Sequence, residues 1–335
     1  MSDTGGCGAM AMLRRVARYL PSLVLLLVLL AVIPGGYPQW LAGYLVLFIL
    51  QGYVAWLLFC KAGQQFYAYS ATMTVGAYTT VVLEHYGIDH LVMEVVAGGV
   101  VAGVVAVAFF LSTSRARGFY AGIASFLLAI LIPTVIQATT SVTGGQNGIT
   151  VNGLNFTWGS TRYFVFIVVV VAAVVALLVW LSDTRVGRIF TLIADNEVLT
   201  EAAGIRTFNF KLLAYAIGGV VSGIGGGLYL NYFGSISSGD ITVFTSVMIF
   251  FMPILGSRRS LYGPIIGACF LVLVPELFTS VEQYMDILMG TAYLVVMLFM
   301  QDGIVAGVAN IIGRVRGTRR GGVCGGEKGF PAGDS

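Results

Sequence analysis

Charged side chains are scarce in this chain. Asp, Glu, Lys and Arg make up 10% of its 335 residues and hydrophobic residues 58%, whereas an ordinary soluble domain is about 25% charged. So few ionisable side chains cannot cover the surface of a soluble enzyme of this size, and disorder requires low hydrophobicity and high charge. A net charge of +3 is too small for a nucleic-acid footprint. These absences leave an integral membrane protein that contacts the lipid bilayer and no nucleic acid.

Catalytic and metal-binding patterns are also absent. The four cysteines stand far apart, and no pair has the spacing of a metal site. The sequence has no GxxxxGK[ST] motif, so the chain cannot itself hold ATP in a P-loop. No nucleophile and base stand in a recognisable pattern. We therefore predict no cofactor, no metal and no enzymatic activity for the chain alone.

Long apolar runs dominate what is present. A helix needs about 20 apolar residues to cross a bilayer, and about ten runs approach that length. The first also fits a signal peptide, because three arginines precede it, and the third can also begin at Phe66 or form a broken helix. The candidate spans are 19–33, 40–59, 70–83, 92–111, 119–140, 163–181, 212–232, 242–255, 261–280 and 287–300.

Basic residues orient these spans. Cytoplasmic loops of membrane proteins are enriched in Lys and Arg. With ten spans and the N-terminus inside, all of the 18 Lys and Arg except Arg162 fall on the inner side. The prediction is an all-α polytopic protein with both termini cytoplasmic. It divides into a cytoplasmic segment 1–18, a transmembrane domain 19–304 and a disordered cytoplasmic tail 305–335. The outer segments carry Glu84, Asp89, Glu94, Asp240, Glu282 and Asp286.

Small residues and prolines predict how the spans pack. Lipid gives helices no hydrophobic reason to associate, so close packing of small residues matters. Gly219, Gly223 and Gly227 form two GxxxG steps on one helix face. We expect them to pack inside the chain rather than at a subunit interface. Pro133 and Pro253 lie inside spans and predict kinks or breaks.

Two connecting segments stand out. In the inner segment 182–211, apolar residues recur at helical spacing and Gly204 is a helix stop. They predict one short amphipathic helix, which either rests on lipid headgroups or docks a cytoplasmic partner. In the outer segment 143–149, three glycines and an Asn-Gly pair allow positive φ. This loop either is a plain surface turn or binds a polar solute.

Ionisable residues are nearly absent from the predicted spans. Glu276 is the exception, about one turn from the outer end of the ninth span. Proton- and ion-coupled carriers place charged residues at membrane depth. The sequence therefore argues against a carrier of that kind.

Several ordered segments resemble a known family. They are Arg117-Gly118-Phe119-Tyr120, the run TGGQNGI at 143–149, the segment 184–205, Gly263-Pro264-Ile265-Ile266-Gly267-Ala268 and Asp302-Gly303-Ile304. Together they resemble the branched-chain amino acid ABC permeases of the LivM type, over residues 60–305. The resemblance implies the fold of a type II ABC importer permease in the cell (inner) membrane. It also implies a second, homologous permease as heterodimer partner, cytoplasmic ATPase subunits that bind the ATP, and an extracytoplasmic solute-binding protein.

The resemblance also implies functional residues. The ATPase coupling loop would comprise Gly187, Arg188, Asp195, Glu197, Glu201, Ala202, Ala203 and Gly204. The substrate pathway would include Gly63, Gln64, Thr143, Gly144, Gly145, Asn147, Gly148 and Ser246. The implied substrates are branched-chain or related small polar amino acids.

The chain departs from the family pattern in three places, one of which is the fifth span, where the family often has an acidic residue and this chain has none. In the pattern GQxSxGHxxFxxxGAY, Phe66, Ala68, Tyr69 and Thr72 replace the usual Ser, Gly, His and Phe. The usual Gly-Gly-x-Gly-Ser turn reads Gly256-Ser257-Arg258-Arg259-Ser260. Related permeases carry urea and simple amides. Such a permease and an ATP-independent channel or facilitator are the alternative interpretations.

Overall fold

The computed structural model describes residues 36–87, 90–115, 119–139, 143–151, 160–237, 239–258, 260–277 and 290–291. Nearly all of this part of the chain is helical. The predicted first span and both terminal segments lie outside it, as does the predicted tenth span apart from residues 290–291. The elements are α2 (Tyr37–Ala55), the π-helix η1 (Trp56–Lys61), α3 (Tyr69–His85), α4 (Leu91–Thr113), α5 (Phe119–Ala138), the 3₁₀-helix η2 (Gly145–Asn147), β1 (Ile149–Thr150), α8 (Ser160–Asp183), α9 (Arg185–Asp195), α10 (Glu197–Ala202), α11 (Thr207–Phe233), β2 (Ser235–Ile236), α12 (Val243–Gly256) and α13 (Gly263–Leu277).

Five helices among these residues are long and apolar enough to cross a membrane: 37–61, 91–113, 119–138, 161–183 and 207–233. They correspond to the second, fourth, fifth, sixth and seventh predicted spans. The third, eighth and ninth predicted spans form shorter helices, α3 of 17 residues, α12 of 14 and α13 of 15. At about 1.5 Å per residue, 14 residues cover roughly 21 Å of a hydrocarbon core of about 30 Å.

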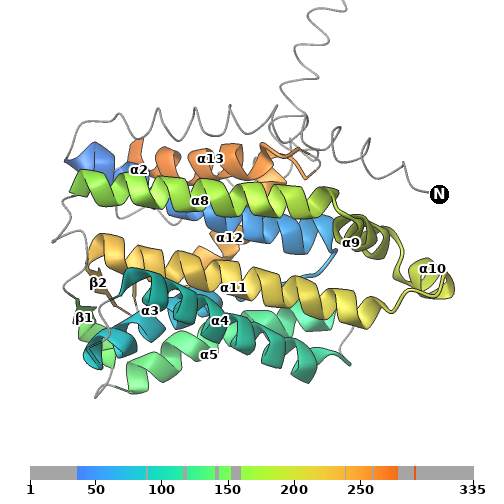
Figure 1. Cartoon of the computed structure of the whole chain (residues 1–335), viewed down its shortest axis with the longest axis horizontal. Coiled ribbons are helices and arrows are strands. Elements are labelled where there is room, and N and C mark those ends of the chain that lie inside the picture. The colour runs from blue at the N-terminus through green and yellow to red at the C-terminus, as the bar shows by residue number, and fades with distance from the viewer. Residues whose placement is uncertain are drawn as a thin grey trace, which may run out of the picture.

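The long helices lie side by side, and their two ends differ (Figure 1). One end carries α9 and α10, which project beyond the bundle, and the other carries β1 and β2. Because α8 runs into α9 and α11 follows α10, the chain reverses direction at the first of these ends. At the second, β1 pairs antiparallel with β2, with Ile149 opposite Ile236. We call them the α9–α10 end and the β1–β2 end.

The predicted glycine stripe of α11 faces α4 and α3 of the same chain. A Cβ placed on Gly219 would lie 2.5 Å from the Cβ of Ala106, and one on Gly223 would lie 2.5 Å from the carbonyl oxygen of Gly98. A Cβ on Gly226 would overlap the carbonyl oxygen of Met73. On Gly227 the nearest atom is the Thr80 hydroxyl oxygen, at 3.1 Å. The absence of side chains therefore brings these helices into backbone contact.

Pro133, Pro253 and Pro275 lie inside continuous helices, so they do not end these helices. Pro264 lies in the first turn of α13, where a missing N–H costs least. The interruption falls elsewhere, where α2 passes into η1 and loop 62–68 leads to α3. Of the two predicted outcomes, a kink or a break, the break does not occur at these prolines in the described helices.

Glu94 corrects another prediction. The sequence assigned this residue to the outer segments, although the predicted span 92–111 contains it; in the structure it lies in the first turn of α4 with only 5% of its surface exposed. Asn231 of α11 donates a hydrogen bond from Nδ2 to its carboxylate, at 3.1 Å. Because Asn231 donates a hydrogen bond to the carboxylate, α4 can bury this acidic side chain in its first turn.

Candidate functional site

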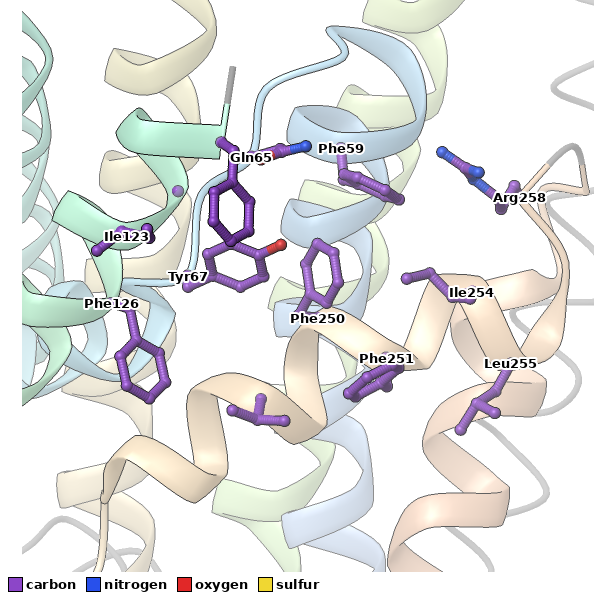
Figure 2. Close-up of a pocket in the computed structure, with 13 residues that line it drawn as sticks. Phe59, Gln65, Tyr67, Ile123, Phe126, Phe250, Phe251, Ile254, Leu255 and Arg258 are labelled. Carbon is purple, nitrogen blue, oxygen red and sulfur yellow. The ribbon is translucent and has the colours of Figure 1, made fainter. Parts of the chain in front are cut away.

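A groove of about 680 Å³ opens between α5 and α12 (Figure 2). This volume lies within the range of small-molecule sites. Most of its wall is aromatic or aliphatic, and its few polar side chains are those of Gln65, Tyr67 and Arg258. The lining residues are Phe59, Gln65, Tyr67, Phe119, Gly122, Ile123, Phe126, Val247, Phe250, Phe251, Ile254, Leu255 and Arg258.

Loop 62–68 forms one wall of the groove. The π-helix η1 precedes it, and such turns occur often at functional sites. The backbone N–H of Tyr67 donates to the Ser125 hydroxyl of α5 at 2.9 Å, and that hydroxyl donates to the Gly122 carbonyl at 2.7 Å. These bonds fix the loop against α5, which leaves the side chains of Gln65 and Tyr67 in the groove.

Aromatic rings form the floor. Phe250 of α12 packs its ring 4.6 Å from that of Phe59 and 4.5 Å from that of Tyr67, measured between centroids. Burial raises the pKa of Tyr67 above its ordinary value. The guanidinium carbon of Arg258 lies 4.6 Å from the centroid of the Phe59 ring. Arg258 is the only charged side chain among the described residues of the lining.

The second candidate site is the α9–α10 end. The sequence predicted one short amphipathic helix here, and the structure has two. Asn196 separates them, because its backbone is extended (φ −159°), and its side chain accepts a hydrogen bond from the Leu199 N–H at 3.1 Å. Gly204 follows α10 with φ +84°, as expected of a helix stop.

Two contacts hold α10 against α11. Lys211 Nζ lies 2.5 Å from a carboxylate oxygen of Glu197, and the Thr207 hydroxyl donates to Glu201 at 2.6 Å. Beside them a polar hollow of about 280 Å³ lies between α10, α11 and loop 62–68. Its lining includes Gly63, Gln64, Glu197, Glu201 and Lys211.

Apolar side chains on the α9–α10 end face outward. The exposed fraction is 51% for Leu192, 75% for Val198 and 67% for Leu199. Charged and small residues surround them, and Arg188, Asp195, Glu197, Glu201, Ala202, Ala203 and Gly204 are all exposed. Gly187, by contrast, is buried where α9 turns away from α8. A Cβ at this position would overlap the Ser182 carbonyl, so a larger residue does not fit. Such a mixed surface suits contact with a protein or with lipid headgroups.

Gly63 joins the two candidate sites. Its backbone has φ +65°, and a Cβ on it would lie 2.7 Å from the Ala194 Cα of α9. Loop 62–68 therefore touches α9 on one side and lines the groove on the other. A larger residue than glycine does not fit between them.

The residues predicted to line the substrate pathway do not lie together in one place. Gly63 and Gln64 lie at the α9–α10 end, and the Gln64 amide donates to the Ala62 carbonyl at 3.0 Å. Ser246 is buried and donates to the Ser70 hydroxyl at 2.7 Å. Thr143, Gly144, Gly145, Asn147 and Gly148 lie at the β1–β2 end, where all three glycines have positive φ.

None of these predicted residues lines the groove, whereas Gln65, next to Gln64, does. Tyr67, Phe250 and Arg258 line the groove and were not among the residues predicted from the sequence. For Arg258 a signal existed, because it lies in the turn that departs from the family pattern.

A bundle with five helices long and apolar enough to cross a membrane defines an integral membrane protein. Residues 41–301 match the family described as branched-chain amino acid transport system / permease component, so the chain belongs to that family. It is therefore a multi-pass protein of the inner membrane. Membership in a family of transport permeases indicates a transport role rather than a catalytic one.

Relatives agree with this assignment. The chain is 25% identical over 268 residues to the high-affinity branched-chain amino acid transport permease LivM of Salmonella typhimurium and to that of Escherichia coli. Each match covers 71% of this chain and 62% of the relative, so the match spans less than two thirds of those relatives. The LivH permease of Salmonella typhimurium is 24% identical over 261 residues, 71% of this chain and 84% of the relative. No solved structure matches the chain.

Proposed function

We propose that this chain is the permease subunit of an ATP-driven ABC importer for branched-chain or related small polar amino acids, delivered by an extracytoplasmic binding protein. The family match over residues 41–301 carries the proposal. The lack of a P-loop agrees with it, because in such an importer separate ATPase subunits bind the ATP. The charged residues of the five long described helices lie near the helix ends rather than at their centres, which agrees as well.

We place the α9–α10 end in the cytoplasm. Among the described residues, the basic ones cluster at the helix boundaries of that end, and Arg162, near the start of α8, is the exception. The positive-inside rule then puts β1 and β2 outside. This orientation agrees with the inner and outer sides predicted for the spans that the structure describes. The residues at the basic end are Lys61, Arg115, Arg185, Arg188, Arg206, Lys211 and Arg258.

A second permease would cover the open side of the groove. Helix α5 exposes a broad apolar face, with Phe119 70%, Tyr120 74% and Leu127 59% exposed. An apolar face of this kind contacts lipid or another membrane helix. Both LivM and LivH relatives match the chain, which supports a heterodimer of two related permeases.

ATP energy would enter through α9 and α10. The exposed Leu192, Val198 and Leu199 offer an ATPase subunit an apolar surface, and Arg188 and Glu197 offer charges beside it. The contact between Gly63 and Ala194 would pass a displacement of α9 to loop 62–68 and so to the groove. Rigid-body motion of this kind can open a pathway alternately to each side.

The test is ATP-driven leucine uptake in proteoliposomes that hold both permeases and the ATPase subunits, with binding protein outside. Arg188→Ala and Glu197→Gln should lower uptake about tenfold, a loss of roughly 1.4 kcal/mol in coupling, while ATP hydrolysis continues. Arg162→Ala at the opposite end is the control and should transport normally. Normal uptake by both loop variants would refute the coupling assignment. Leucine uptake by the purified chain without ATP would instead favour a facilitator.

A further inference from the structure

The groove carries one charge, and that charge lies at its inner end. Arg258 follows α12 at the α9–α10 end and lines the groove together with Phe59 (Figure 2). The ion pair between Lys211 and Glu197 is the one that the structure shows among its described residues, so no carboxylate in that part of the chain neutralises Arg258. Arg258 is also solvent-exposed. Its positive charge is therefore available to a ligand.

Arg258 is held in place by an aromatic ring rather than by an acid. Its guanidinium carbon lies 4.6 Å from the centroid of Phe59, whose own ring packs against Phe250. A guanidinium that stacks on a ring keeps N–H donors in its plane, and their fork matches the two oxygens of a carboxylate. The arrangement limits the movement of Arg258 without using all of its donors.

The rest of the groove suits an apolar group. Ile123 and Phe126 of α5 face Phe250 and Phe251 of α12 across it, and no acidic side chain lines it among the described residues. A ligand that fits would carry a carboxylate at one end and a branched hydrocarbon at the other. An amino group would find the aromatic faces and the open side of the groove, where a cation is tolerated.

We propose that Arg258 binds the carboxylate of a branched-chain amino acid at the inner end of the groove, and that this contact makes the groove prefer carboxylates to uncharged amides. The inference rests on the proposed transport function and narrows its substrate class. It excludes urea and simple amides as preferred substrates. Arg258 acts here as a specificity-determining residue.

The experiment measures equilibrium binding of radiolabelled leucine to the nucleotide-free complete transporter in nanodiscs, without binding protein. Two competitors share the leucine skeleton, 4-methylpentanoate with a carboxylate and 4-methylpentanamide with a neutral amide. For the wild-type chain the acid should compete at least about tenfold better than the amide, because a hydrogen bond to a charged group is stronger than one between neutral groups. Arg258→Gln should abolish the difference, and Arg258→Lys should keep part of it. Arg162→Gln removes the same charge far from the groove and should keep all of it.

The outcomes separate the two proposals. Equal competition by acid and amide in the wild type, a full difference in Arg258→Gln, or no leucine binding to the wild type would overturn the role of Arg258. If Arg258→Gln fails to fold, the wild type and Arg258→Lys still decide the matter. The transport function fails on a separate measurement, the absence of ATP-driven uptake with binding protein present.

Discussion

The contact of α11 with α3 and α4 and the contact of α5 with α12 are built in opposite ways. In the first, glycines bring backbones together and leave no space for a methyl group at Gly226. In the second, aromatic side chains hold the helices apart around a groove of about 680 Å³. Close-packed interfaces resist deformation, whereas side chains around free volume can rearrange at small cost. We infer that the contact of α11 with α3 and α4 is a rigid scaffold and that the region around the groove can change shape.

The largest expected effect is at the scaffold. Gly226→Ala places a Cβ on the Met73 carbonyl, whereas Gly227→Ala places one 3.1 Å from a hydroxyl oxygen that can move. We expect the first change to lower the free energy of unfolding by about 3 kcal/mol and the second to be nearly neutral. Thermal unfolding of the two purified variants in detergent measures the difference. Equal midpoints for this neighbouring pair would contradict a scaffold held by backbone contact.

The next effect is at the groove. Phe251→Ala removes a lining ring of α12, while Phe244→Ala removes a ring of the same helix that is 79% exposed and outside the lining. Because Phe251 already borders open space, we expect a stability loss of about 1 kcal/mol rather than the 3–5 kcal/mol of a core position. Leucine uptake should fall several-fold for Phe251→Ala and stay unchanged for Phe244→Ala. If stability falls as steeply as for Gly226→Ala, the groove is not the adaptable region.

The smallest expected effect is the loss of a hydrogen bond between helices of the scaffold, which can be compared with the loss of close glycine packing. Thr72 of α3 donates a hydrogen bond to the Ser222 hydroxyl of α11 at 2.8 Å, whereas Thr79 donates only within its own helix, to the Val75 carbonyl. Hydrogen bonds between membrane helices average about 0.6 kcal/mol, so Thr72→Val should cost about that much more than Thr79→Val. Chemical unfolding of both variants measures this cost. A loss as large as that of Gly226→Ala would show that polar contacts, not glycine packing, hold the scaffold.

The sequence predicted those parts of the fold that depend on local pattern. Long apolar runs identified the five long helices, and Gly204 marked the end of α10, because a helix and its stop are encoded within a few turns. It did not predict that Asn196 divides the inner segment into two helices. An extended backbone at one residue leaves no mark in the periodicity of the apolar positions.

The site depended on distant pairs that local pattern does not show. The burial of Glu94 was not predicted, because the partner that accommodates its carboxylate, Asn231, stands 137 residues away in the chain. The groove was missed because Phe59, Ile123 and Phe250 belong to three separate segments. The family resemblance pointed to Gly63 and Gln64, which lie next to the groove but do not line it. A sequence motif identifies a region of the chain more reliably than it identifies which side chains contact a ligand. The positive φ of Gly148 was predictable, but its packing against Ile236 was not.

The fit of Gly63 against Ala194 has a consequence for information flow in the reverse direction. If an ATPase on α9 changes how tightly the groove holds a solute, thermodynamic linkage requires an occupied groove to change the ATPase affinity by the same factor. The loop of seven residues from Ala62 to Ala68 is then a sensor as well as a transmitter. The ATPase on the inner face would then bind an occupied transporter with a different affinity from an empty one, before it hydrolyses ATP.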